Sequence, residues 1–143
     1  MQVMYIATAT SQGDGREGRV RTADDRIDLV LAHPKEFGGS GEGSNPEQLF
    51  AAGYSACFHS AVRNVARERK VAVTGSSVTA EVGIGRLDDR PGMGLAVTLQ
   101  VSLPGVPVET AREVVEAAHQ LCPYSNATRG NVDVQLVIAE SAQ

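Results

Sequence analysis

Two cysteines, Cys57 and Cys122, are the residues of this chain most able to do chemistry. A thiolate is a nucleophile, and a sulfenic acid formed on one cysteine condenses with a second thiol to give a disulfide. In a reducing compartment such a pair is usually catalytic or redox-sensing, although each thiol could equally be a small buried hydrophobe. The cysteines are 65 positions apart (122 minus 57), so the sequence does not show whether they meet.

Histidines near the cysteines raise two alternatives. Cys57, His59, His119 and Cys122 can all bind zinc, and His119 and Cys122 could share one face of a helix. Cys57 and His59, however, are separated by about 200° around a helix, so they cannot chelate one ion unless the helix breaks. The second alternative is a cysteine–histidine nucleophile that uses His33, His59 or His119, and no local signature supports it. No metal site is therefore predicted.

A helix is predicted to carry Cys57. Asn45 can cap it, Pro46 suits its first position, and Glu47 places a negative charge in its first turn. We expect this helix to extend to about residue 69. Residues 49–58 (LFAAGYSACF) contain no charged side chain, which predicts a helix buried on all sides. Such apolar surroundings raise the pKa of a thiol, so Cys57 would need a nearby cation to react.

The rest of the chain predicts strands and one further helix. Alternating and β-branched apolar residues favour strands over residues 3–10, 19–22, 27–31, 77–87, 95–103 and 132–139. An apolar stripe predicts a helix over residues 107–120, and Pro123 should end or bend it at Cys122. This order predicts one α+β domain, residues 1–143, in which antiparallel sheet wraps over helices.

Composition excludes several classes of protein. The 143 residues include 13 Lys and Arg and 17 Asp and Glu, which are mixed along the chain and form no basic stripe for nucleic acid. The apolar runs are too short to cross a membrane. The first residues lack the basic segment of a signal peptide, so the expected location is the cytoplasm.

Three segments resemble the organic hydroperoxide resistance (Ohr) family of the Ohr/OsmC superfamily. They are GREGR at residues 15–19, NPEQLFAAGYSACF at 45–58 and HQLCPYSNATRGN at 119–131. The resemblance implies an OsmC-like fold, an intertwined homodimer in which sheets wrap two central helices. It also implies a thiol peroxidase that reduces alkyl and fatty-acid hydroperoxides without metal or flavin. The reductant would be a dithiol such as dihydrolipoamide on a lipoylated protein.

The resemblance also implies a role for each of four residues. Cys57 would be the peroxidatic cysteine, Cys122 the resolving cysteine, Arg16 the cation beside the thiolate and Glu47 the carboxylate that holds Arg16. An arginine is always charged, and its planar fork can meet a thiolate and a carboxylate together. Arg19 competes for the role of Arg16, and Glu47 could simply complement the helix dipole.

Helix geometry adds a constraint. Glu47 and Cys57 are ten residues apart, about 15 Å along a continuous helix, so one guanidinium is not expected to reach both. We therefore predict that Cys57 meets the Arg16–Glu47 pair of the other subunit, or that the helix breaks near Gly53. The runner-up function is non-enzymatic, a dimer that binds apolar ligands or senses oxidation. A cysteine-dependent hydrolase is a third hypothesis.

Overall fold

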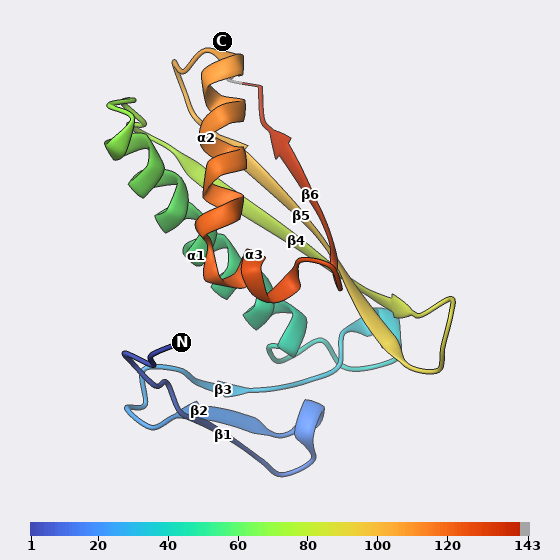
Figure 1. Cartoon of the computed structure of the whole chain (residues 1–143). Coiled ribbons are helices and arrows are strands. Elements are labelled where there is room, and N and C mark those ends of the chain that lie inside the picture. Colours follow the sequence, from blue (N-terminus) through green and yellow to red (C-terminus); the bar gives the residue numbers. More distant parts are fainter. Residues whose placement is uncertain (141–143) are drawn as a thin grey trace. The chain divides into compact units, whose positions relative to one another are not determined.

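The structure, a computed structural model, describes residues 1–140 of the chain. It contains helices and two three-stranded sheets, which confirms the predicted α+β class (Figure 1). The chain divides into two compact units. The N-terminal unit comprises Met1–Leu49, and the C-terminal unit starts at Phe50. Each unit is described by itself.

The N-terminal unit is built on an antiparallel sheet of order β1-β2-β3. Its strands are β1 (Ala9–Gln12), β2 (Arg19–Thr22) and β3 (Asp28–Val30). The expected strand over residues 3–10 is present only at Ala9 and Thr10, because no strand within residues 1–140 pairs with residues 1–8. The short helices η1 (Gly15–Glu17) and η2 (Lys35–Phe37) lie in the loops.

Helix α1 (Pro46–Glu68) begins in the N-terminal unit and continues into the C-terminal unit. Its start is a capping box: the Gln48 amide donates to Asn45 Oδ1 over 2.9 Å, and the Asn45 amide donates to Gln48 Oε1 over 3.2 Å. The predicted start and end of this helix are therefore confirmed. The expectation of burial on all sides is wrong for this chain, because only one face meets the core and Ala52 and Ala56 are exposed.

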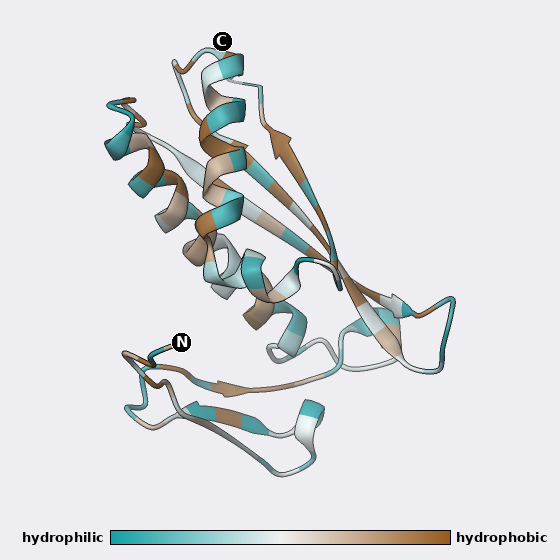
Figure 2. Cartoon of the chain, in the orientation of Figure 1, coloured by the Kyte–Doolittle hydropathy of each residue, from teal (hydrophilic) through white to brown (hydrophobic). Residues whose placement is uncertain are grey.

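The C-terminal unit places helices on one face of the second sheet, of order β4-β5-β6. Its strands are β4 (Ser77–Arg86), β5 (Met93–Ser102) and β6 (Asp133–Ile138). Hydrophobic and hydrophilic residues alternate along β5 (Figure 2). The inward residues Val97, Leu99 and Val101 pack into one core cluster with buried residues of both α1 and α2 (Val108–Leu121), so both helices cover the same face.

One strand pairing differs from the expected antiparallel sheet. β4 and β5 form an antiparallel hairpin, but β6 pairs with β5 in parallel. The reason is the connection between them: the chain passes through α2 and α3 (Pro123–Thr128) before β6, and such a crossover returns the strand in the same direction. None of the helices in residues 1–140 is long and apolar enough to span a membrane.

Candidate active site

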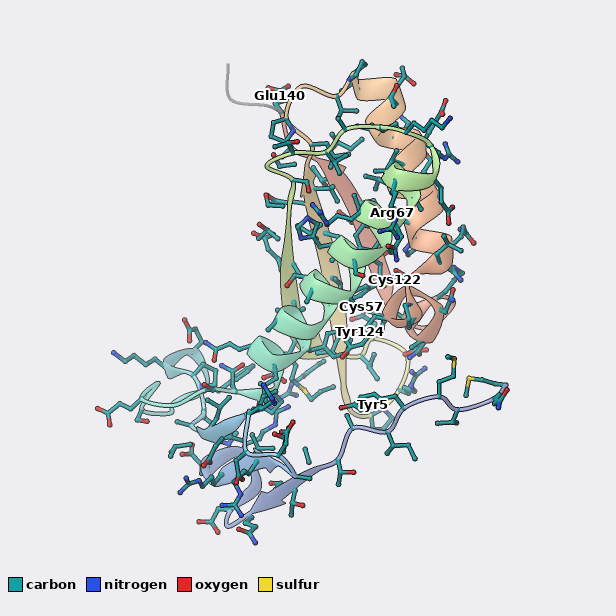
Figure 3. The ribbon with its side chains drawn as sticks, turned by 90° about the vertical axis from the view of Figure 1, so that its left-hand side faces the viewer. Tyr5, Cys57, Arg67, Cys122, Tyr124 and Glu140 are labelled. Atoms are coloured by element: carbon teal, nitrogen blue, oxygen red, sulfur yellow. The ribbon has the colours of Figure 1, made fainter. Side chains whose placement is uncertain are left out.

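Cys57 and Cys122 face each other inside the C-terminal unit. Cys57 lies in the middle of α1, and Cys122 lies at the joint between α2 and α3, where its backbone is extended. Pro123 explains that joint, because a residue before proline avoids helical backbone. The two Sγ atoms are 3.5 Å apart and both thiols are free (Figure 3). A disulfide needs about 2.05 Å, so the two sulfurs must approach by roughly 1.5 Å to bond.

Burial controls the pKa of the Cys57 thiol. Desolvation raises this pKa above its ordinary value, and the neighbouring Cys122 raises it further. The backbone N–H of Tyr124 opposes both effects, because a hydrogen bond to the sulfur stabilises the thiolate. Burial is the largest of these effects, so the thiol form is favoured until a cation approaches the sulfur.

Aromatic rings lie beside the sulfur pair. The Tyr124 ring centroid is 5.6 Å from that of Tyr54 and 6.2 Å from that of Phe50. Gly53, one turn before Cys57, leaves room for Tyr124: a Cβ at this position would be 2.9 Å from the Tyr124 hydroxyl oxygen. The surroundings of Cys57 are therefore apolar and aromatic, which suits a substrate with an organic group.

Arg16 and Glu47 form a two-point ion pair within the N-terminal unit. Arg16 donates from Nη2 to Glu47 Oε1 over 2.7 Å and from Nη1 to Oε2 over 3.0 Å. The hydrogen bonds to Arg16 hold the pKa of the Glu47 carboxyl below its ordinary value. Gly18 shapes the loop behind Arg16, because a side chain there would collide with the Gln12 carbonyl. The competing Arg19 is paired elsewhere, with Asp28 over 2.7 and 2.8 Å.

A buried polar cluster next to Cys122 was not predicted from the sequence. The Tyr54 hydroxyl lies 2.9 Å from Ser125 Oγ and 3.1 Å from Thr128 Oγ1. His119 Nδ1 lies 2.8 Å from the same Ser125 oxygen. Ser125 is fully buried, which is uncommon for serine. The only available signal was the concentration of hydroxyl residues after Pro123, and a surface helix would have the same composition.

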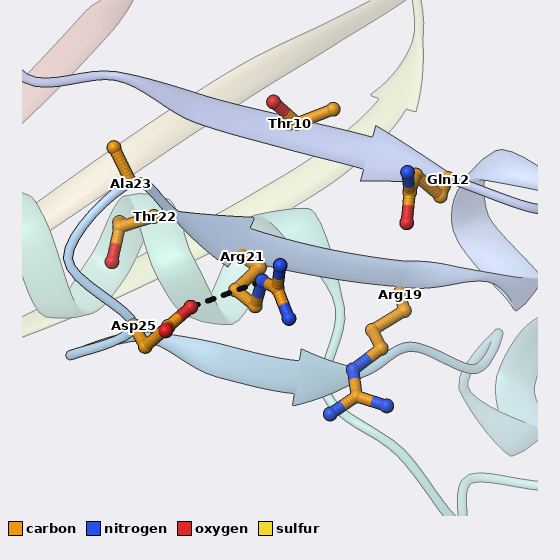
Figure 4. Close-up of a pocket in the computed structure, with 7 residues that line it drawn as sticks. All are labelled: Thr10, Gln12, Arg19, Arg21, Thr22, Ala23 and Asp25. Carbon is orange, nitrogen blue, oxygen red and sulfur yellow. Dashed lines mark ion pairs between the residues drawn. The ribbon is translucent and has the colours of Figure 1, made fainter.

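A metal centre and a surface cavity are further candidates for a functional site. In residues 1–140, no group of three or more His, Cys, Asp or Glu side chains is placed to hold a metal ion. His59 instead contacts the Ser76 hydroxyl at 2.9 Å. Figure 4 shows a polar cavity on the N-terminal sheet, lined by Thr10, Gln12, Arg19, Arg21, Thr22, Ala23 and Asp25. Its arginines are neutralised by ion pairs, such as Arg21 with Asp25.

Comparison with known proteins identifies the family. The family described as OsmC-like protein matches residues 39–137. An organic hydroperoxide resistance protein of Xanthomonas axonopodis pv. citri is 48% identical over 140 residues, and the match covers 96% of each chain. This chain belongs to the OsmC-like family, among its organic hydroperoxide resistance proteins.

Solved OsmC-like structures confirm the fold. An organic hydroperoxide resistance protein from Elizabethkingia anophelis matches with a TM-score of 0.92 and 44% identity, covering 99% of this chain and 100% of that one. OhrB of Bacillus subtilis matches with a TM-score of 0.86 and 40% identity, covering 94% of this chain and 98% of that one. The resemblance drawn from the three sequence segments is thereby confirmed. The roles of the four site residues stay predictions.

Proposed function

We propose that this protein is a cysteine-based peroxidase that reduces organic hydroperoxides. The observation that supports the proposal most strongly is the 3.5 Å separation of the Cys57 and Cys122 sulfurs in an apolar environment. Two free thiols at this distance, one partly exposed and one buried, suit a peroxidatic and a resolving cysteine. The names of the relatives from Xanthomonas and Bacillus supply the substrate class.

The proposed reaction has three balanced steps. The Cys57 thiolate attacks the outer peroxide oxygen, the O–O bond breaks, and the alkoxide takes a proton and leaves as alcohol. Cys57 is then a sulfenic acid, oxidised by two electrons. The Cys122 sulfur attacks Cys57 sulfur, an S–S bond forms, and the hydroxyl leaves with the Cys122 proton as water. A dithiol then reduces the disulfide by exchange and becomes a cyclic disulfide.

In this proposal the Arg16–Glu47 pair supplies the missing cation. The Cys57 pKa is raised by burial, and a guanidinium beside the sulfur would lower it. Helix α1 is continuous from Pro46 to Glu68, so the alternative of a break near Gly53 is wrong. The separation of ten positions between Glu47 and Cys57 therefore favours a site in which one subunit's cysteine meets the other subunit's Arg16.

A homodimer is part of the proposal. Met4, Tyr5 and Ile6 are 96, 80 and 75% exposed, an apolar segment that a monomer would leave in water. The uncharged face of α1 at Ala52 and Ala56 is also exposed. Burial of both features against a second copy would remove this apolar surface from water. The dithiol reductant, such as dihydrolipoamide on a lipoylated protein, and the cytoplasmic location stay predictions.

The test is peroxide consumption with cumene hydroperoxide and dihydrolipoamide. The wild-type chain should turn over many times, and Cys57→Ser should consume no peroxide. Cys122→Ser should react about once and then accumulate sulfenic or higher oxidation states, because nothing resolves Cys57.

Two outcomes would overturn the proposal. Undiminished turnover by Cys57→Ser would remove the proposed nucleophile. A wild-type protein that reacts once and is never recycled by any dithiol would favour the redox-sensing alternative. Hydrogen peroxide serves as the comparison substrate, and we expect it to react more slowly because the site is apolar.

A further inference from the structure

The four side chains of the buried polar cluster, Tyr54, His119, Ser125 and Thr128, surround the joint that carries Cys122. Tyr54 lies on α1, three residues before Cys57. His119 lies on α2, three residues before Cys122, and Ser125 lies on α3, three residues after it. The Ser125 hydroxyl contacts both Tyr54 and His119. This single oxygen therefore links α1, which carries Cys57, to α2, which immediately precedes Cys122.

Counting protons fixes the direction of every hydrogen bond in this cluster. Thr128 Oγ1 donates to the Ser125 carbonyl oxygen, so the Tyr54 hydroxyl must donate to Thr128. Ser125 must then donate to Tyr54, and His119 must donate from Nδ1 to Ser125. Each of the four side chains therefore donates one proton, and each proton serves one hydrogen bond. Burial lowers the pKa of His119, which agrees with a neutral ring that carries its proton on Nδ1.

Hydrogen bonds are directional, so they restrict the relative positions of the helices that they join more than apolar packing does. Burying hydroxyl groups costs free energy unless they are paired, and a fully paired network rigidifies the elements that it joins. In residues 1–140 no buried side-chain polar atom lacks a partner. Backbone bonds complete the frame, since Cys122 donates to the Ala118 carbonyl and accepts from the Asn126 amide.

We propose that the Tyr54–Ser125–His119 network is a positioning device for the resolving step, holding Cys122 where it can attack oxidised Cys57. The inference rests on the proposed function, because only a disulfide-forming enzyme needs this step. The two sulfurs must close from 3.5 Å to bonding distance. Since a misplacement of about 1 Å can slow a reaction about a hundredfold, a loosened joint should slow this step more than the first.

Two variants separate the two steps. Tyr54→Phe keeps the ring and removes the hydrogen bond to α1, and Ser125→Ala removes the bonds to both α1 and α2. Ser77→Ala, at an exposed position of β4, is the control. Rapid-mixing kinetics with one equivalent of cumene hydroperoxide follow loss of the Cys57 thiolate and then formation of the disulfide. We expect thiolate loss within about twofold of wild type and disulfide formation slower by about tenfold in both variants.

Dimedone labelling provides a second readout, because a longer-lived sulfenic acid should be trapped in larger amounts by this reagent. Disulfide formation within about twofold of wild type in both variants would overturn the proposal. A loss of both steps in equal proportion would also overturn it, since a merely structural role predicts that result.

A third measurement does not depend on peroxidase activity. Equilibration of the thiol pair with reduced and oxidised dithiothreitol gives the effective concentration of Cys122 at Cys57. This value should fall about tenfold in Tyr54→Phe and Ser125→Ala but not in Ser77→Ala. If the wild-type chain consumed no peroxide, the proposed function would fail, and an unchanged equilibrium would separately refute the positioning role.

Discussion

At the scale of single residues, the main question is how Cys57 becomes a thiolate. Burial raises the pKa of the Cys57 thiol, and the hydrogen bond from the Tyr124 backbone amide lowers it. Burial is the larger effect, so the pKa stays above its ordinary value. A cysteine in the middle of a 23-residue helix is also outside the first turn, where the helix dipole acts. A guanidinium is the remaining source of positive charge, and Arg16 has the carboxylate that would hold it in place.

Arg16→Gln should therefore change the pH dependence of the first step. Only the thiolate attacks peroxide, so the rate rises with pH until Cys57 is ionised. Loss of an opposite charge near a titrating group moves its pKa by about 1 unit or more, here upward, so the variant's profile should move to higher pH. The measurement is the rate of Cys57 oxidation between pH 5 and pH 9, a range of about 2 units to either side of neutrality.

Arg19→Gln is the matched control, because Arg19, at the start of β2 and three residues after Arg16, also forms a two-point pair, with Asp28. Its profile should coincide with that of the wild type. Equal shifts in the two variants would mean that general electrostatics, and not a specific contact of Arg16, ionise Cys57.

The residue types of the site and the contact between Arg16 and Glu47 were predictable, but the polar cluster beside Cys122 was not. Cys57, Cys122, Arg16 and Glu47 were identified through a resemblance in three segments, and the pairing of Arg16 with Glu47 agrees with the expected contact. The polar cluster escaped prediction because Ser125 and Thr128 look like surface residues until α3 is placed against α1. Burial of a hydroxyl depends on tertiary packing, which residue type and spacing do not encode locally.

At the scale of elements, the predictions that held are those that depend on residues adjacent in the sequence. Asn45, Pro46 and Gln48 determine the start of α1 through capping, and Pro123 determines the joint after α2. The direction of β6 was not predictable from its alternating residues, because alternation identifies a strand but not its partner. The strand expected over residues 3–10 is present only at Ala9 and Thr10 for a similar reason, because residue type does not determine how far the pairing with β2 extends.

The joint at Cys122 yields a prediction for Pro123→Ala. Proline fits the first position of α3, where no amide hydrogen bond is lost, so it restricts the unfolded chain without straining the folded one. Replacement should lower the free energy of unfolding by about 0.4–1 kcal/mol. It should also slow disulfide formation, because Cys122 then gains access to helical backbone. Urea denaturation of the reduced protein and single-turnover kinetics measure the two effects.

Pro91→Ala provides the control for this prediction, because Pro91 is exposed in the loop between β4 and β5. A comparable change in stability is expected there, but disulfide formation should keep the wild-type rate. Slower disulfide formation in both variants would attribute the effect to general loosening of the fold.

At the scale of the whole molecule, the central prediction is that each active site is shared by two subunits. Exposed apolar residues at the start of the chain and on α1 favour a second copy as their cover. If Cys57 draws its cation from the partner, a monomer contains the sulfur pair and the ion pair but no complete site. Complementation between two inactive subunits distinguishes a shared site from one formed within a single chain.

The experiment refolds Cys57→Ser and Arg16→Gln subunits together in equal amounts. In a mixed dimer with shared sites, the intact Cys57 of one subunit meets the intact Arg16 of the other, and the second site carries both defects. Random mixing makes half of the dimers mixed, so about a quarter of wild-type activity should return. If the cation comes from the same chain, every site in the mixed dimer carries one defect and no activity returns. Recovery should be measured at a pH where Arg16→Gln alone is slow, with separately refolded subunits as the baseline.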